Sequence, residues 1–94
     1  MQSLQISNIA IIMKAMPNVE IKIGGYTDNT GDPKANRSLS LDRANAVAAA
    51  LIAKEIQPGR LTTEGYGSEH PVADNNTTEG KEQNRRVAIR VTKK

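Results

Sequence analysis

Hydrophobic and polar positions follow two different periods in the first part of the chain. In residues 4–16 apolar side chains recur every three or four positions up to Pro17, which predicts a helix with one buried stripe. The segment Val19–Ile23 instead alternates β-branched and charged residues, which predicts a half-buried strand. We expect this strand to stop at Gly24-Gly25, because glycines often punctuate regular elements.

The second part of the chain contains the longest helical pattern, followed by two strand patterns. The helix is expected to begin near Ala35 or Asn36 and to end before Pro58. Residues 60–67 and 86–92 predict strands, and residues 79–84 predict a short helix. The predicted apolar stripe of the long helix consists of Leu39, Ala44, Val47, Ala48, Leu51 and Ile52.

The order of these elements predicts the fold class. Helix, strand, helix, strand and strand indicate an α+β domain with helices on one face of a small mixed sheet. At 94 residues the chain forms one domain, 1–94, with a small core. That core must be aliphatic, since there is no Phe or Trp and there are only two Tyr residues.

Composition excludes several functional classes. The chain has no cysteine and one histidine, His70, so thiolate zinc sites, disulfides and cysteine nucleophiles are excluded, and we expect no metal and no cofactor. There is no nucleophile elbow of the G-x-S-x-G type, so we do not expect an enzyme. The longest apolar run has eight residues, too few for a membrane span.

The net charge of +3 is concentrated at the C-terminal end. This distribution leaves open an alternative function, a basic module that binds nucleic acid or protein through its last strand. The lack of Phe and Trp, which usually stack on bases, argues against nucleic acid. The basic residues are Arg85, Arg86, Arg90, Lys93 and Lys94.

A candidate site lies between the first strand and the long helix, in the polar segment 26–31. On that helix Asn36 and Arg43 are seven residues apart, so they differ by only about 20° and share a face. If that face looks toward the end of the strand, Asp28 and Arg43 come close together. An acid beside a guanidinium suits a zwitterion such as an amino acid head group. The alternative is that Asp28 caps a turn and Arg43 is a solvated charge.

The chain also resembles the OmpA C-terminal-like domain family. The resemblance extends over most of the chain and is carried by the segments Gly25–Gly31 (GYTDNTG), Asn36, Leu39-Ser40, Arg43-Ala44, Val47, Leu51, Gly65–Gly67 (GYG), Pro71 and Asn84–Val87 (NRRV).

What the resemblance implies is a non-enzymatic, periplasmic module of the outer membrane that binds peptidoglycan without a covalent bond and anchors its parent protein to the cell wall. In that family the ligand is meso-diaminopimelate of the stem peptide. Carried over to this sequence, Asp28 takes the ammonium and Arg43 the carboxylate. Thr27, Asn36 and Arg85 complete the implied site.

The sequence departs from the family pattern at two places. The family usually has histidine where Tyr26 stands, a position that we expect to serve packing. The family also has a βαβαββ order, and its first strand is missing from this chain. We expect this to leave Val19–Ile23 and its neighbours with an open sheet edge, through which two chains could form a homodimer.

Overall fold

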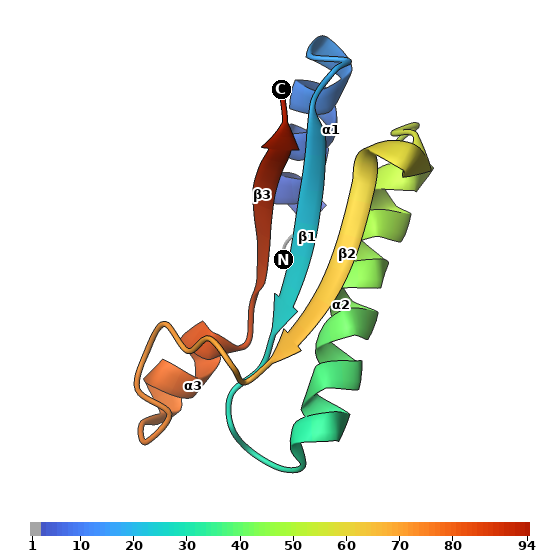
Figure 1. Ribbon diagram of the computed structural model, residues 1–94. Coiled ribbons are helices and arrows are strands. Elements are labelled where there is room, and N and C mark those ends of the chain that lie inside the picture. Colours follow the sequence, from blue (N-terminus) through green and yellow to red (C-terminus); the bar gives the residue numbers. More distant parts are fainter. Residues whose placement is uncertain (1–2) are drawn as a thin grey trace.

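The computed structural model describes residues 3–94, in which two long helices pack on one face of a three-stranded sheet (Figure 1). A third, short helix lies beyond one end of the sheet. The predicted α+β class is therefore confirmed. In chain order the elements are α1 (Ser3–Ala15), β1 (Glu20–Tyr26), α2 (Pro33–Ala53), the 3₁₀ turn η1 (Pro58–Arg60), β2 (Leu61–Gly67), α3 (Thr78–Asn84) and β3 (Val87–Lys93).

The sheet is mixed, with the strand order β2-β1-β3. Strand β1 runs parallel to β2 and antiparallel to β3, so it is the central strand. The expectation that Val19–Ile23 lies at an open edge is therefore wrong, and Ile21 and Ile23 are buried at 3% and 0% exposure. Within residues 3–94 the unpaired edges belong to β2 and β3.

The core between the helices and the sheet is built from aliphatic side chains and one methionine, as composition predicted. On α2 the buried positions are Ser40, Ala44, Val47 and Leu51. Leu39 and Ile52, which were expected in the stripe, are 43% and 42% exposed. The core comprises Ala10, Met13, Val19, Ile21, Ile23, Ala44, Val47, Leu51 and Ile56.

The two glycines of β1 do not end the strand, which continues to Tyr26. A Cβ atom at Gly25 would lie 1.8 Å from the carbonyl oxygen of Ser40 on α2. The backbone of β1 and the helix thus approach each other too closely for any side chain. Gly25 is a packing residue inside a strand, and this explains why the predicted stop at Gly24-Gly25 is wrong.

The long helix begins at Pro33, two residues before the predicted start. Asp32 precedes it in an extended conformation. Proline suits the first position of a helix because the N–H that it lacks has no partner within the helix there. The earlier start brings the first turn of α2 directly against the loop that leaves β1.

Candidate functional site

The candidate site lies where β1 and β2 end side by side and β3 begins. The loop after β1 is held by its backbone, since the Thr27 amide donates to the Gly67 carbonyl at 2.8 Å. The Thr27 hydroxyl donates to the carbonyl of Asp28 at 2.8 Å, and the residue is buried. The structure thus gives Thr27 a role in shaping the loop.

Asp28 is the buried acid of this loop, with 6% of its surface exposed. Its Oδ1 accepts from the Thr30 amide at 2.8 Å, and its Oδ2 accepts from Nη1 of Arg85 at 2.7 Å. The Thr30 bond, with a contribution from Arg85, lowers the pKa of Asp28 although burial acts in the opposite direction. A carboxylate offers about four acceptor positions, so these two bonds leave acceptor capacity on Asp28 for a further donor.

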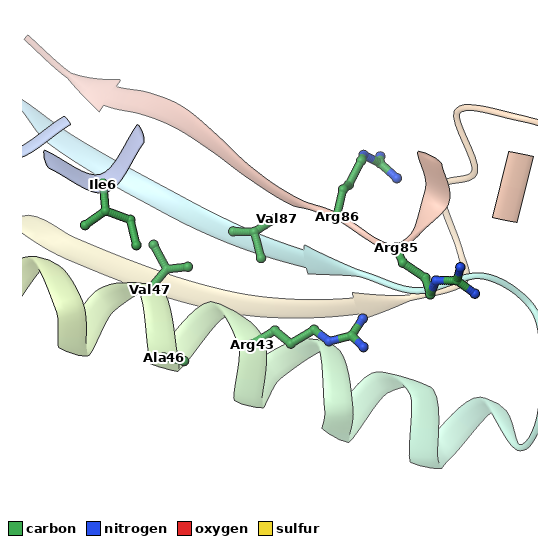
Figure 2. Close-up of a pocket in the computed structure, with 7 residues that line it drawn as sticks. All are labelled: Ile6, Arg43, Ala46, Val47, Arg85, Arg86 and Val87. Carbon is green, nitrogen blue, oxygen red and sulfur yellow. The ribbon is translucent and has the colours of Figure 1, made fainter. Parts of the chain in front are cut away.

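Arg43 lies on α2 and lines a pocket of about 420 Å³. Figure 2 shows Arg43 and Arg85 reaching toward the same end of this pocket, while Arg86 points to the other side of β3. The inner wall is apolar and includes Val47 and Val87. Two guanidinium groups beside apolar side chains have the chemistry to hold a carboxylate with an aliphatic neighbour.

Asp28 and Arg43, which spacing was expected to bring close together, do not form an ion pair with each other. Asp28 pairs with Arg85, and Arg43 makes no ion pair with any residue in 3–94. Asn36 does lie at the loop, where its Nδ2 donates to the Thr30 carbonyl at 3.0 Å. Thr27, Asp28, Asn36 and Arg85 therefore gather at one loop, and Arg85 connects this group to the pocket that contains Arg43.

Ser40 positions this loop from inside the helix. It is fully buried, and its Oγ accepts from the Gly67 amide at 2.9 Å while donating to the Arg37 carbonyl at 2.7 Å. Gly67 has a φ of +61° and carries the carbonyl that receives the Thr27 amide. The sequence could have indicated that Ser40 is buried, because Ser40 shares the helical spacing of Ala44, but not which groups it would hydrogen-bond.

Asn84 fixes the other side of the site and is also fully buried. Its Oδ1 accepts from the amides of Val72 and Ala73 at 2.7 and 3.0 Å. Its Nδ2 donates to the Ala73 carbonyl and to Oδ1 of Asn75. This network ties the long loop to α3 immediately before Arg85. No local pattern in the sequence points to it.

The arrangement suits the binding of a ligand with both charges. Within residues 3–94 no group of three or more His, Cys, Asp or Glu side chains could hold a metal ion. None of the helices described is long and apolar enough to cross a membrane. The charged groups available are the ionised carboxylate of Asp28, the guanidinium of Arg43, which has no ion pair within residues 3–94, and the guanidinium of Arg85. Arg85 contacts Asp28 and lines the pocket that contains Arg43.

Comparison with known proteins identifies the family. Residues 2–85 match the model of the OmpA family. The chain is 43% identical over 84 residues to the probable lipoprotein YiaD of Escherichia coli, and this alignment covers 89% of this chain and 38% of YiaD. It is equally identical over 84 residues to the peptidoglycan-binding protein ArfA of Mycobacterium tuberculosis, covering 89% of this chain and 26% of ArfA.

The fold agrees with this assignment. The crystal structure of the peptidoglycan-associated lipoprotein from Burkholderia pseudomallei superposes with a TM-score of 0.90 at 29% identity, covering 97% of this chain and 80% of that one. The chain spans well under half the length of the two curated relatives. Since the family model covers nearly the whole sequence, the chain belongs to the OmpA family, a family of non-enzymatic domains.

Proposed function

We propose that this domain binds peptidoglycan without a covalent bond by recognising meso-diaminopimelate in the stem peptide. The observation that carries the proposal is a buried, ionised Asp28 joined through Arg85 to a pocket where Arg43 has no acidic partner in residues 3–94. Relatives named as a peptidoglycan-binding protein and a peptidoglycan-associated lipoprotein support it.

Each charged end of the ligand has a partner of opposite charge. The ligand ammonium donates to the free acceptor positions of Asp28, and the carboxylate of the same carbon accepts from Arg43. Arg85 stays on Asp28 and adds a donor for the carboxylate from the opposite wall. Thr27 and Asn36 act by holding the loop, since both hydrogen-bond within it.

Binding of this kind anchors a parent protein to the cell wall. Two of the similar proteins are lipoproteins, the YiaD and Burkholderia proteins. We therefore place the domain on the periplasmic side of the outer membrane. The basic last strand is not needed for the proposal, and the match to the OmpA family favours peptidoglycan over the alternative of nucleic acid.

Sedimentation with insoluble peptidoglycan tests the proposal. Asp28→Ala and Arg43→Ala should each weaken binding by about ten- to a hundredfold, because a charge-assisted hydrogen bond contributes roughly 1.5–3 kcal/mol. Asp42→Ala and Lys54→Ala are matched controls. Asp42 is an exposed acid beside Arg43, and Lys54 follows the far end of α2. Equal sedimentation of all four variants with the parent would contradict the site.

Titration with soluble stem peptides tests the identity of the ligand. Lysine carries the ammonium but lacks the carboxylate on that carbon, so Arg43 would be desolvated without a partner. We expect meso-diaminopimelate peptides to bind more than about tenfold tighter than L-lysine peptides. The amide chemical shifts of Asp28 and its loop should move at lower peptide concentrations with the first than with the second. Equal affinity in calorimetry would rule out the role of Arg43.

A further inference from the structure

The sheet face that carries no helix holds a cluster of aromatic and basic side chains. Tyr26 and Tyr66, the only aromatic residues of Phe, Trp or Tyr type in the chain, stack with their ring centroids 5.0 Å apart. Arg86 lies over Tyr26, with the guanidinium carbon 3.8 Å from the ring centroid. The His70 ring lies nearly perpendicular to both, with centroid distances of 6.4 Å to Tyr26 and 5.4 Å to Tyr66. We call this cluster, together with Lys22 and Arg90, the basic face.

A shallow pocket of about 340 Å³ lies on the basic face. Two of the residues that line it, Gly24 and Ala88, are small and lie opposite each other in the β1-β3 register. The tyrosine pair borders one side, and the cross-strand partners Lys22 and Arg90 also line it. The pocket thus joins small residues at its base to hydroxyl groups and cations at its rim.

The charges of the basic face do not balance. Lys22 pairs with Glu64 at 2.7 Å, and Arg86 donates to the His70 carbonyl at 3.1 Å. Arg90 is exposed and forms no ion pair with any residue in 3–94. Lys22, Arg86 and Arg90 thus share one acid, Glu64, because Glu20 on the same face of β1 pairs with Lys93. Such a surface is complementary to an anion.

The basic face adjoins the proposed ligand site through the chain itself. Tyr26 directly precedes Thr27 and Asp28, and Arg86 directly follows Arg85. Tyr26 and Arg86 exchange backbone hydrogen bonds of 2.8 and 3.3 Å across the two strands. Arg85 reaches the pocket of Arg43, whereas Arg86 points to the other side of β3 (Figure 2). A branched polymer held at Asp28 can therefore extend onto the opposite face.

We propose that the basic face is a second contact surface for the same polymer, and that it binds the carboxylates of a further stem peptide around Arg90 and Lys22. The inference rests on the proposed function, since the wall supplies many such carboxylates close together. Two weak contacts on one polymer add affinity because the second contact is made at high effective concentration. A single soluble stem peptide gains nothing from it.

Charge reversal at Arg90 tests this proposal, with Lys54→Glu as the control that makes the same change in net charge. R90E should fold, because it places opposite charges across from each other at Lys22. Three probes are used: a soluble stem peptide with meso-diaminopimelate, insoluble cross-linked peptidoglycan and anionic phosphatidylglycerol vesicles. Affinity is measured at low and at high salt.

We expect R90E to bind the soluble peptide like the parent but to bind the insoluble polymer at least about fivefold more weakly at low salt, a gap that closes at high salt. K54E should match the parent with every probe. Equal binding of R90E and the parent to the polymer, an equal loss in K54E, or a loss seen only with vesicles would overturn the inference. If the parent binds neither peptide nor polymer, the proposed function fails as well.

Discussion

Replacement of Asn84 by alanine should destabilise the domain more than any change at an exposed residue of α3. Asn84 is fully buried and makes four hydrogen bonds, two of them to the backbone amides of Val72 and Ala73. N84A removes the only hydrogen-bond acceptor that these two amides have in the described structure. It also leaves a small space beneath the loop.

The magnitude follows from the number of amides left without a partner. An unsatisfied buried donor costs about 1–3 kcal/mol, so two amides give an upper range of roughly 2–6 kcal/mol. Val72 is 62% exposed, and water can therefore reach part of the loop, which favours the lower end, about 2–3 kcal/mol. For a domain of this size that lowers Tm by roughly 10–20 °C.

Thermal unfolding and amide hydrogen exchange measure the two consequences separately. N84A should show the lower Tm together with faster exchange at Val72 and Ala73. The matched control is Gln83→Ala, which removes an exposed amide side chain from the same helix and should change stability by less than about 0.5 kcal/mol. A Tm for N84A within a few degrees of the parent, with both amides still protected, would refute the reasoning.

Two further predictions concern pH and assembly. The folded-state pKa of Asp28 lies below its ordinary value of 3.8, so its contribution to stability is complete above that pH and is lost as the pH falls through the lowered value. Asp28→Asn should therefore flatten the acid limb of a curve of unfolding free energy against pH. An unchanged acid limb would contradict this prediction. The outer edge of β3 is unpaired, and Val91 on this strand is 47% exposed. We expect the protein to self-associate through this edge and Val91→Lys to weaken the association. Light scattering that shows a monomer of about 10 kDa at every concentration would contradict this prediction.

The periodic part of the fold could be predicted from sequence because periodicity depends on which face of an element is buried. The strands near residues 61–67 and 87–93 and the helix near 78–84 were placed within one or two residues. The order of strands in the sheet could not be predicted in this way. Placing Val19–Ile23 at an edge was wrong because it rested on a strand known only from the family pattern, whereas β1 is flanked on both sides.

The buried polar residues show where reading the sequence by local pattern is insufficient. Ser40 and Asn84 acquire their roles from backbone groups 27 and 11 or 12 residues away. Gly25 acquires its role from a helix carbonyl 15 residues later in the chain. Such partners are set by the packing of elements, which no local window contains. Asp28, by contrast, was singled out from the polar, aperiodic segment 26–31 together with the helical spacing of Arg43, and Thr27 only from the family resemblance.

These long-range contacts also determine how precisely the candidate site is held. Asp28 is fixed through Thr27 and Gly67 from β2 and through Arg85 from the end of α3, while Ser40 fixes Gly67 from α2. The loop after β1, the end of β2 and the segment before β3 are therefore each held by at least one hydrogen bond that is buried or partly buried before a ligand arrives. A ligand that meets a preformed site does not lose affinity to the ordering of loops. Neither Ser40 nor Asn84 would touch the ligand, yet substitution of either residue should weaken binding, because the loops that carry the contacting residues would be held less firmly.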